Sequence, residues 1–440
     1  MLPPQVKKQA NMDMNFKSRR HRYAVILLFL GAILLRGAIL WARQEELEHD
    51  PDAYRLIANN LLLRHTYSIS PENVEPQPTA YRPPLYPLML ALVSTGKTGV
   101  ANSTVAVFHL LLGVLTIGLT FWLATLWRLG NWSFFAAALI ACDPILLHQS
   151  TLVMTETMAT LLAVVALLCF TRLARHPCWW SAGLCGASMA TAALCRPTFL
   201  VWLVLAAPAV GLLEQEWKKR FHNLLSFTLF ALACLTPWIV RNAQQIGYPI
   251  IATTHGGYTL WLGNNNSFYE HIRQDSWDSV WDFQQWQRER PPRPGQAITQ
   301  HHELSTDQQQ YEQALATIRS QPTMFVWSSL VKLGRLWRPW PHATTKNESG
   351  LDRLTRYIIG AWYGILFMLA ILASMKLRTQ LWRSPWLWGV LACGSFSLIH
   401  SFFWSNMRMR APLMPFLCLL AAQGAVFCCH SMNRRKSCQR

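Results

Sequence analysis

Two aspartates and an arginine stand out in the segment between the first two apolar stretches of the chain. Asp50 and Asp52 precede an amphipathic stretch, and Arg82 lies in an aromatic, proline-rich turn that also contains Tyr81 and Tyr86. A carboxylate within reach of a hydroxyl can act as a general base, and a guanidinium binds phosphate oxygens through paired hydrogen bonds. Placed beside apolar sequence, these groups suit chemistry on an anionic lipid.

Asp50 also has a simpler interpretation. An Asp followed by Pro is a typical helix start, with the Asp as N-cap and the Pro as first helical residue, and Asp52 would then complement the helix dipole. The helix is predicted from apolar residues at helical spacing, namely Tyr54, Ile57, Ala58, Leu61 and Leu62. Capping and catalysis are compatible, because a capping carboxylate usually keeps a free lone pair, and both roles stay open.

Several arginines border apolar stretches on the side predicted to be non-cytoplasmic, where the positive-inside rule disfavours them. They are Arg82, Arg196, Arg241, Arg408 and Arg410. Together they predict a site for a lipid phosphate or pyrophosphate; the alternative is that each contacts outer-leaflet headgroups by itself. Tyr54, Tyr81, Tyr86 and Glu156 complete the predicted substrate-binding set, although Glu156 could instead complement the dipole of its own helix.

A metal site is only weakly indicated. His255 could bind a metal, but it has no neighbouring carboxylate in the sequence. The eleven cysteines contain no CxxC pair and most lie in apolar stretches, which favours packing roles. The sequence therefore predicts no certain cofactor and leaves a divalent metal open.

The elements that position these residues are predicted to be transmembrane helices. The chain has 440 residues, 52% hydrophobic and only 14% charged, and its apolar residues form blocks long enough to cross a bilayer. Ten spans are predicted, at residues 23–41, 103–126, 132–149, 155–171, 179–195, 198–213, 222–240, 357–374, 386–404 and 411–429.

The net charge of +18 follows from this topology. Basic residues gather in the two tails, 1–22 and 430–440, and in alternate joints between spans, so both tails are predicted to be cytoplasmic. No nucleic-acid surface is needed to explain the charge. Two segments then lie outside: the first outer loop, 42–102, within a catalytic module at 23–240, and a small, mainly helical domain at 241–356, followed by the C-terminal spans at 357–429.

The outer domain contains two predicted helices. One lies near 303–320, and the other is an amphipathic stretch from Met324 to Trp340. Its tryptophans, Trp327, Trp337 and Trp340, stand beside Lys332, Arg335 and Arg338, which predicts a helix lying on the lipid headgroups.

The chain resembles a family in a set of segments whose order matches the predicted spans. They are Asp50 four residues before Tyr54, Tyr81-Arg82-Pro83-Pro84, Thr155-Glu156, Arg196-Pro197, Pro237 to Asn242, Gly257 to Asn265, and Arg408 to Pro415. In these it is similar to bacterial family 39-type glycosyltransferases, polytopic enzymes of the GT-C fold class related to protein O-mannosyltransferases and lipid A aminoarabinose transferases.

The resemblance implies a polyprenyl-phosphate sugar as donor. It also implies that Asp50 is the catalytic acidic residue of the first outer loop and that Arg82 lies against the carrier phosphate. The aminoarabinose-transferase relatives have a Glu-Lys-Pro turn with a metal-binding carboxylate, whereas Tyr81 precedes Arg82 here. That difference puts a metal site in doubt.

The predicted function is an inverting transfer of the sugar to a lipid, polysaccharide or protein, with Asp50 (or Asp52) as base, at the periplasmic face of a bacterial inner membrane. Its partners would be the donor, membrane lipids and the acceptor, and no nucleic acid. One alternative is a transporter or flippase for a lipid-linked sugar, although the ionisable groups cluster at one surface instead of the bilayer midplane. A non-catalytic partner in an envelope complex is the other alternative.

Overall fold

The computed structural model describes residues 4–95, 99–275, 281, 300–342 and 349–438, and every regular element within them is a helix. Six helices are long and apolar enough to cross a membrane: α1 (Pro4–Ala42), α4 (Asn102–Leu126), α7 (Glu156–Arg175), α10 (Trp217–Ile246), α16 (Gly350–Leu377) and α18 (Met414–Cys438). The prediction of an all-α, polytopic membrane protein is confirmed in this sense.

The other predicted spans coincide with shorter helices: α5 (Trp132–Ala141), α6 (Pro144–Gln149), α8 (Trp179–Cys195), α9 (Phe199–Gly211) and α17 (Trp386–Phe402). The span predicted at 132–149 is interrupted: α5 ends at Ala141, and Asp143 caps α6, where its side chain accepts a hydrogen bond from the Leu146 N–H at 3.0 Å. Short 3-10 helices lie at η1 (Gln44–Glu48), η2 (Arg378–Trp382) and η3 (Met407–Leu413).

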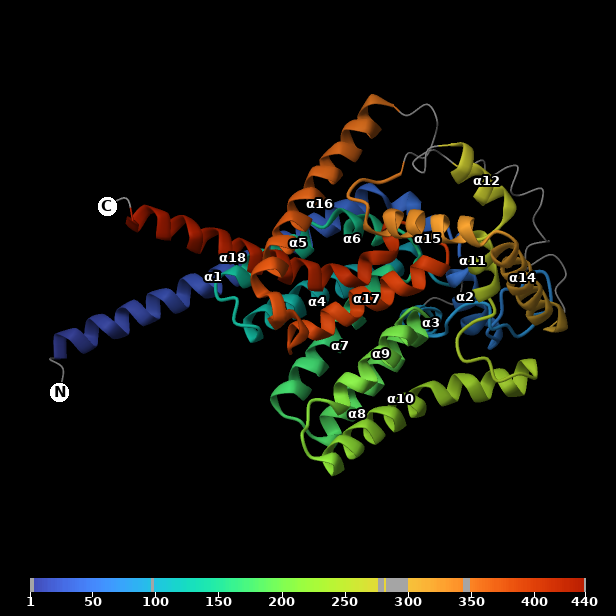
Figure 1. The fold of residues 1–440 in the computed structure, drawn as a ribbon, viewed down its shortest axis with the longest axis horizontal. Coiled ribbons are helices and arrows are strands. Elements are labelled where there is room, and N and C mark those ends of the chain that lie inside the picture. The colour runs from blue at the N-terminus through green and yellow to red at the C-terminus, as the bar shows by residue number, and fades with distance from the viewer. Residues whose placement is uncertain (1–3, 96–98, 276–280, 282–299, 343–348, 439–440) are drawn as a thin grey trace.

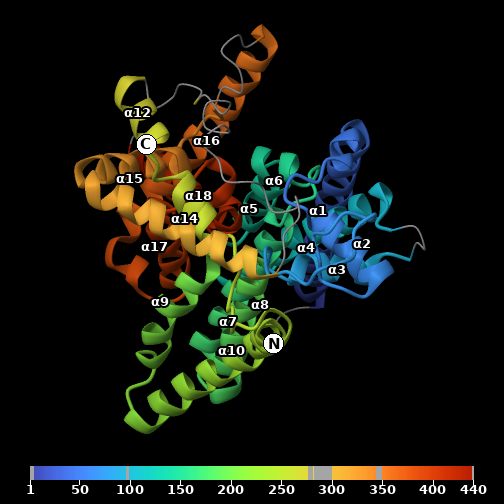
Figure 2. The same cartoon turned by 90° about the vertical axis from the view of Figure 1, so that its right-hand side faces the viewer.

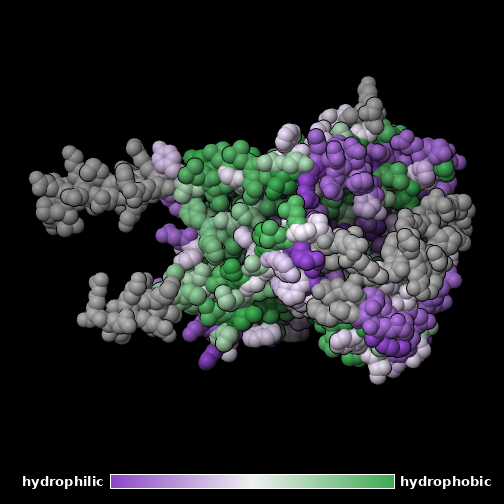
Figure 3. Space-filling model, turned by 90° about the horizontal axis from the view of Figure 1, so that it is seen from above, coloured by the Kyte–Doolittle hydropathy of each residue, from purple (hydrophilic) through white to green (hydrophobic). Residues whose placement is uncertain are grey.

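The helices outside the predicted spans lie at one end of the molecule. They are α2 (Tyr54–Arg64), α3 (Leu85–Val93), α11 (Gly256–Leu262), α12 (Asn266–Gln274), α14 (Gln300–Ser320) and α15 (Pro322–Trp337). The N-terminal end of α1 and the C-terminal end of α18 point away from α11, α12 and α14 (Figures 1 and 2). On the face shown in Figure 3, apolar side chains cover the middle of the molecule, while hydrophilic side chains gather at the end opposite the two tails.

Glycines allow two pairs of helices to approach closely. A Cβ at Gly186 of α8 would lie 2.0 Å from the Phe227 carbonyl oxygen of α10, and a Cβ at Gly424 of α18 would lie 2.1 Å from the Leu369 carbonyl oxygen of α16. A larger residue would push either pair apart. Small residues at helix crossings are a common way of packing helices in a membrane.

The boundaries of the outer elements differ from the prediction. Helix α10 continues to Ile246 and ends at Gly247, whose φ of +88° is readily adopted by glycine. Arg241 therefore belongs to the helix and does not begin the outer domain. At the far end of that domain, α16 starts at Gly350, because the Ser349 hydroxyl caps it by accepting from the Asp352 N–H.

The basic side chains of helix α15 face the interior of the protein, whereas the sequence predicted that they lie on the lipid headgroups. Lys332, Arg335 and Arg338 are buried, whereas Val326 and Leu330 of the same helix are 59% and 56% exposed. The Lys332 ammonium donates to the Phe402 carbonyl at 2.9 Å and to the Asn264 side-chain oxygen at 3.0 Å. Burial lowers the pKa of Lys332 to about 7. The apolar face of α15, and not its basic face, is thus the exposed one.

Candidate active site

Five segments far apart in the sequence bring their charged side chains together at one end of the spans. They are the start of α2, the turn at Arg82, the start of α7 at Glu156, the joint between α8 and α9 at Arg196, and η3 with Arg408. The Tyr54 side chain lies close to the charged groups of four of these segments. Burial raises the pKa of Tyr54, and the charges of Arg82, Asp52, Glu156 and Arg196 all act on it.

Asp50 caps α2 from outside the helix. The helix begins at Tyr54 and not at Pro51, because Ala53 has a φ of 60°, a left-handed conformation that non-glycine residues rarely adopt. One carboxylate oxygen of Asp50 accepts from the Leu56 N–H at 2.9 Å. The other, Oδ1, is buried and has no hydrogen-bond partner in the part of the chain that the structure describes. A cap with one oxygen left over is the arrangement that a combined capping and catalytic role requires.

Asp52 binds Arg82. The two side chains form an ion pair at 2.7 Å, and the Arg82 Nε also donates to the Asp52 carbonyl at 2.9 Å. The Arg82 guanidinium lies over the rings of Tyr81 and Tyr54, 4.7 and 5.6 Å from their centroids. Arg82 is buried and Asp52 half-buried. These two bonds use two of the five N–H groups of the guanidinium and fix its plane, which leaves donors for a ligand.

Glu156 joins two of the predicted phosphate-binding arginines. Its carboxylate lies 3.0 Å from the guanidinium of Arg196 and 3.7 Å from that of Arg408. The Glu156 side chain is buried, whereas that of Arg408 is 34% exposed. The dipole of α7 contributes little to this geometry compared with two nearby cations. The trio has one more positive than negative charge, so an anion can bind beside it.

A buried hydrogen-bonded chain lies next to the cluster, and none of its members except Tyr54 and Tyr86 was predicted as a site residue. Tyr54 and Tyr86 pack edge to face at 5.3 Å. The Tyr86 hydroxyl contacts the His109 Nε2 at 2.8 Å, and the His109 Nδ1 contacts the Ser150 carbonyl at 2.8 Å. A carbonyl only accepts, so Nδ1 donates to it, and in the neutral ring Tyr86 must donate to Nε2. A histidine on an apolar helix beside a polar joint was the available signal.

Glu303 of α14 fastens the loop that carries Arg82. Its carboxylate accepts hydrogen bonds from the Thr79 hydroxyl at 2.5 Å, from the Ala80 N–H at 3.0 Å and from the Thr254 hydroxyl. The sequence predicted Glu303 only as a member of a helix. Yet it shares one buried helical face with Asp307, Gln310 and Ala314, and a buried acid on such a face needs partners.

Replacing Glu303 by Ala is expected to destabilise the protein by about 3 kcal/mol, because three donors around a buried carboxylate lose their acceptor. Transfer activity should fall with it, since the Arg82 loop loses its anchor. Thermal unfolding of the purified protein in detergent measures the first effect. Glu312→Ala is the matched control, because Glu312 is exposed on the same helix. A Glu303→Ala protein that melts with the control would rule out this anchoring role.

Two predicted phosphate-binding arginines serve other groups. The Arg241 guanidinium donates to the Thr79 and Tyr67 carbonyls at 2.6 and 3.2 Å, and so attaches the first outer loop to α10. Arg410 is fully buried, lies over the Tyr363 ring at 4.5 Å and donates to the Leu336 carbonyl at 2.9 Å. The structure brings neither into the cluster around Tyr54, because backbone carbonyls and aromatic rings at their own positions already hold them.

His255, the weak metal candidate, packs against tyrosines. Its ring centroid lies 4.7 Å from that of Tyr81 and 4.8 Å from that of Tyr258. Within the described ranges, no group of three His, Cys, Asp or Glu side chains could hold a metal ion.

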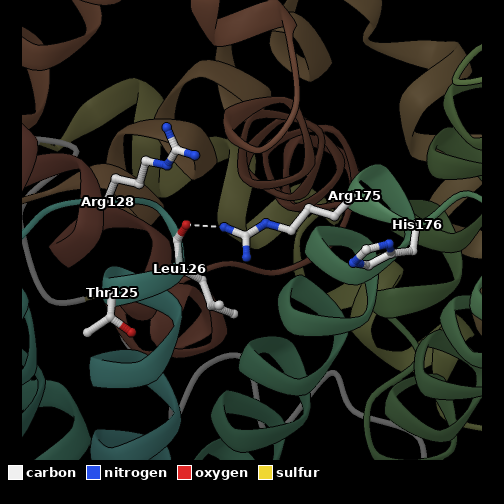
Figure 4. Close-up of a pocket in the computed structure, with 5 residues that line it drawn as sticks. All are labelled: Thr125, Leu126, Arg128, Arg175 and His176. Atoms are coloured by element: carbon white, nitrogen blue, oxygen red, sulfur yellow. Dashed lines mark hydrogen bonds between the residues drawn. The ribbon is translucent and has the colours of Figure 1, made fainter.

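A separate pocket lies at the far end of α7 from this cluster. It has a volume of about 500 Å³ (Figure 4) and is lined by Thr125, Leu126, Arg128, Arg175 and His176, with Arg175 donating to the Leu126 carbonyl. Helix α7 runs from Glu156 to Arg175, and 20 residues of helix span about 30 Å. This pocket therefore belongs to the joints predicted to be cytoplasmic and takes no part in the cluster.

Comparisons by sequence give no assignment. No model of a known protein family matches the chain. No curated protein matches it either.

Solved structures resemble this one in the arrangement of helices. ArnT from Cupriavidus metallidurans bound to undecaprenyl phosphate is 13% identical, with a TM-score of 0.43, and the match covers 91% of this chain and 77% of that one. The apo oligosaccharyltransferase from Archaeoglobus fulgidus is 11% identical, also with a TM-score of 0.43, and the match covers 94% and 52%. This chain spans about half the length of that oligosaccharyltransferase. At such low TM-scores and identities, any functional assignment has to rest on the residues of the cluster itself.

Proposed function

We propose that this protein is an inverting glycosyltransferase. It moves a sugar from a polyprenyl-phosphate donor to a lipid, polysaccharide or protein acceptor at the outer face of the membrane, in a GT-C-like arrangement. The observation that carries the proposal is the Asp50 carboxylate, which keeps one buried oxygen without a partner beside the Asp52–Arg82 ion pair. A base and a phosphate-binding cation are thus positioned by the same short helix and the turn packed on it.

The reaction is a single displacement at the anomeric carbon. The acceptor oxygen forms the new bond to this carbon while Asp50 takes the acceptor's hydroxyl proton. The bond between the anomeric carbon and the phosphate oxygen breaks, and its electron pair leaves with the polyprenyl phosphate. The configuration at the anomeric carbon inverts, because the acceptor attacks from the side opposite the leaving group.

The leaving phosphate needs cations more than it needs a general acid, because it departs as an anion. Arg82 is oriented for this task by Asp52 and by the two tyrosine rings. Arg196 and Arg408 lie nearby around Glu156, and Arg408 is the more exposed of the two. Their positions support a phosphate bound between the Arg82 turn and the start of α7.

Mass spectrometry of envelope lipids, polysaccharides and glycoproteins from a strain that lacks the protein tests this proposal. A sugar should disappear from one class of acceptor, and polyprenyl-phosphate sugar should accumulate. The purified protein should release polyprenyl phosphate from a short-chain donor when that acceptor fraction is added. An unchanged envelope combined with an absence of donor turnover would contradict the proposal.

The pH dependence of the reaction follows from the environment of Asp50. Burial raises the pKa of the Asp50 carboxyl, although the backbone N–H groups of Leu56, Arg55 and Tyr54 act in the opposite direction. A general base works only when ionised, so kcat/KM is expected to fall as the pH decreases through this raised pKa, above the value of about 3.9 typical of Asp.

The contribution of Asp50 to the stability of the protein should change with pH in the opposite direction to the activity. A carboxyl whose pKa is raised by folding stabilises the protein below its unfolded pKa, and this contribution is lost as the pH rises through the folded pKa. As the pH rises through this range, activity should therefore increase while the contribution of Asp50 to stability decreases. Rate profiles and thermal melts on the same preparation measure both. A rate that stays constant through this range, as far as the protein remains folded, would argue against Asp50 as the base.

A further inference from the structure

A cationic pocket lies next to the cluster, and of its lining residues the proposed reaction uses only Arg408. It has a volume of about 270 Å³ and is formed by α6, the end of α15, the start of α16 and η3. Arg408 links the two sites, because its side chain lines this pocket and also lies 3.7 Å from Glu156. The pocket is smaller than the clefts that enclose a whole drug-sized ligand.

The polar lining is cationic. Arg335, Arg338 and Arg408 contribute guanidinium groups, and His148 and His342 contribute rings. The Arg338 guanidinium lies 5.1 Å from the centroid of Trp340, a contact that holds its plane. Arginine forks held in this way match the oxygens of a phosphate.

The apolar surroundings indicate where the ligand comes from. Ile145 and Ile359 line the pocket beside the cations. Two of the helices that line it, α15 and α16, also expose apolar residues, with Leu330 of α15 56% exposed and Ile358 of α16 62% exposed. Apolar surface on this scale in a membrane protein faces lipid. A ligand that places an anionic group in the pocket can lay hydrocarbon along these two helices.

We propose that this pocket binds the anionic phosphate headgroup of a membrane lipid, with Arg338 and Arg408 as the phosphate-binding residues and the acyl chains along α15 and α16. The volume fits a headgroup and not an entire lipid. The inference does not depend on the proposed transfer, because it concerns lipid binding and rests on Arg338, which has no assigned part in that reaction.

Native mass spectrometry of the full-length protein in detergent tests the proposal by titration with three probes. Dioleoyl phosphatidic acid carries a phosphate monoester and two chains, dioleoyl phosphatidylcholine has the same chains with no net charge, and inorganic phosphate has no chains. We expect phosphatidic acid to bind about tenfold or more tightly than either of the others, since one charge-assisted contact is worth a tenfold change or more. Equal binding of the two lipids, or equal binding of phosphate and phosphatidic acid, would overturn it.

Two variants locate the binding. Arg338→Gln removes the charge, and Ile359→Trp fills the pocket from its apolar side, so either one decides the matter if the other does not fold. Each is expected to lower the affinity for phosphatidic acid about tenfold. The control is Arg353→Gln, because Arg353 is exposed on α16 and does not line the pocket. If every folded variant binds phosphatidic acid as the control does, the lipid binds elsewhere and the proposal fails.

Discussion

Replacing Asp50 by Asn is expected to lower the turnover of a short-chain polyprenyl-phosphate sugar about a hundredfold or more. That is the usual contribution of a positioned general base. The amide has nearly the same shape as the carboxylate, and its oxygen can still accept from the Leu56 N–H, so α2 should keep its cap. The amide cannot take a proton, and the loss of activity should appear in kcat without a comparable loss of donor affinity.

Stability separates the two roles of Asp50. Because burial already disfavours the charged carboxylate, Asp50→Asn should change the free energy of unfolding by no more than about 1 kcal/mol. Asp50→Ala is the informative contrast, since it removes the cap as well as the base and should lower both stability and turnover. Near-normal turnover in Asp50→Asn would leave this residue as a cap alone.

The matched control for the base is Asp52→Asn. Asp52 orients Arg82 and is not assigned the proton, so its amide variant should retain much more activity than Asp50→Asn. If Asp52→Asn lost more activity than Asp50→Asn, Asp52 and not Asp50 would be the base. Measuring both variants with the same donor and acceptor makes the comparison independent of the absolute rate.

Replacing Arg82 by Ala is expected to lower transfer about a hundredfold and to weaken donor binding, because a preorganised cation beside the leaving phosphate is lost. Arg82→Lys should recover only part of the activity and of the donor affinity, since an ammonium cannot reproduce the paired hydrogen bonds of the guanidinium. The measurements are kcat and the dissociation constant of the donor analogue. Unchanged values in Arg82→Ala would contradict the phosphate role.

The ion pair with Asp52 complicates this experiment, because Arg82→Ala leaves a half-buried carboxylate without its cation. A double variant, Asp52→Asn with Arg82→Ala, removes the pair together. If Arg82 acts only by neutralising Asp52, the double variant should recover activity. If Arg82 binds the phosphate, the double variant should stay as inactive as Arg82→Ala.

The sequence by itself determined the membrane architecture and the candidate acids. Blocks of apolar residues at bilayer length predict the helices wherever they occur, because burial in hydrocarbon depends on composition over about twenty residues. The buried face of α2 follows equally from spacing, and Tyr54, Ile57 and Ala58 are buried as predicted. Asp50 and Asp52 stood out because they directly precede a predicted helix start in the loop that also carries Arg82.

Only the tertiary structure decided what each charged side chain contacts. Arg82, Arg241 and Arg410 look alike in the sequence, yet one pairs with Asp52 and the others donate to carbonyls of distant segments. The basic side chains of α15 face inward for the same reason. Lys332 finds acceptors from residues 264 and 402, which no local pattern can anticipate. Glu303 likewise reaches Thr79 across 224 residues of sequence. The periodicity of apolar residues predicts which residues are buried. A buried charge, however, is stable only beside particular partners, and these are set by the tertiary structure.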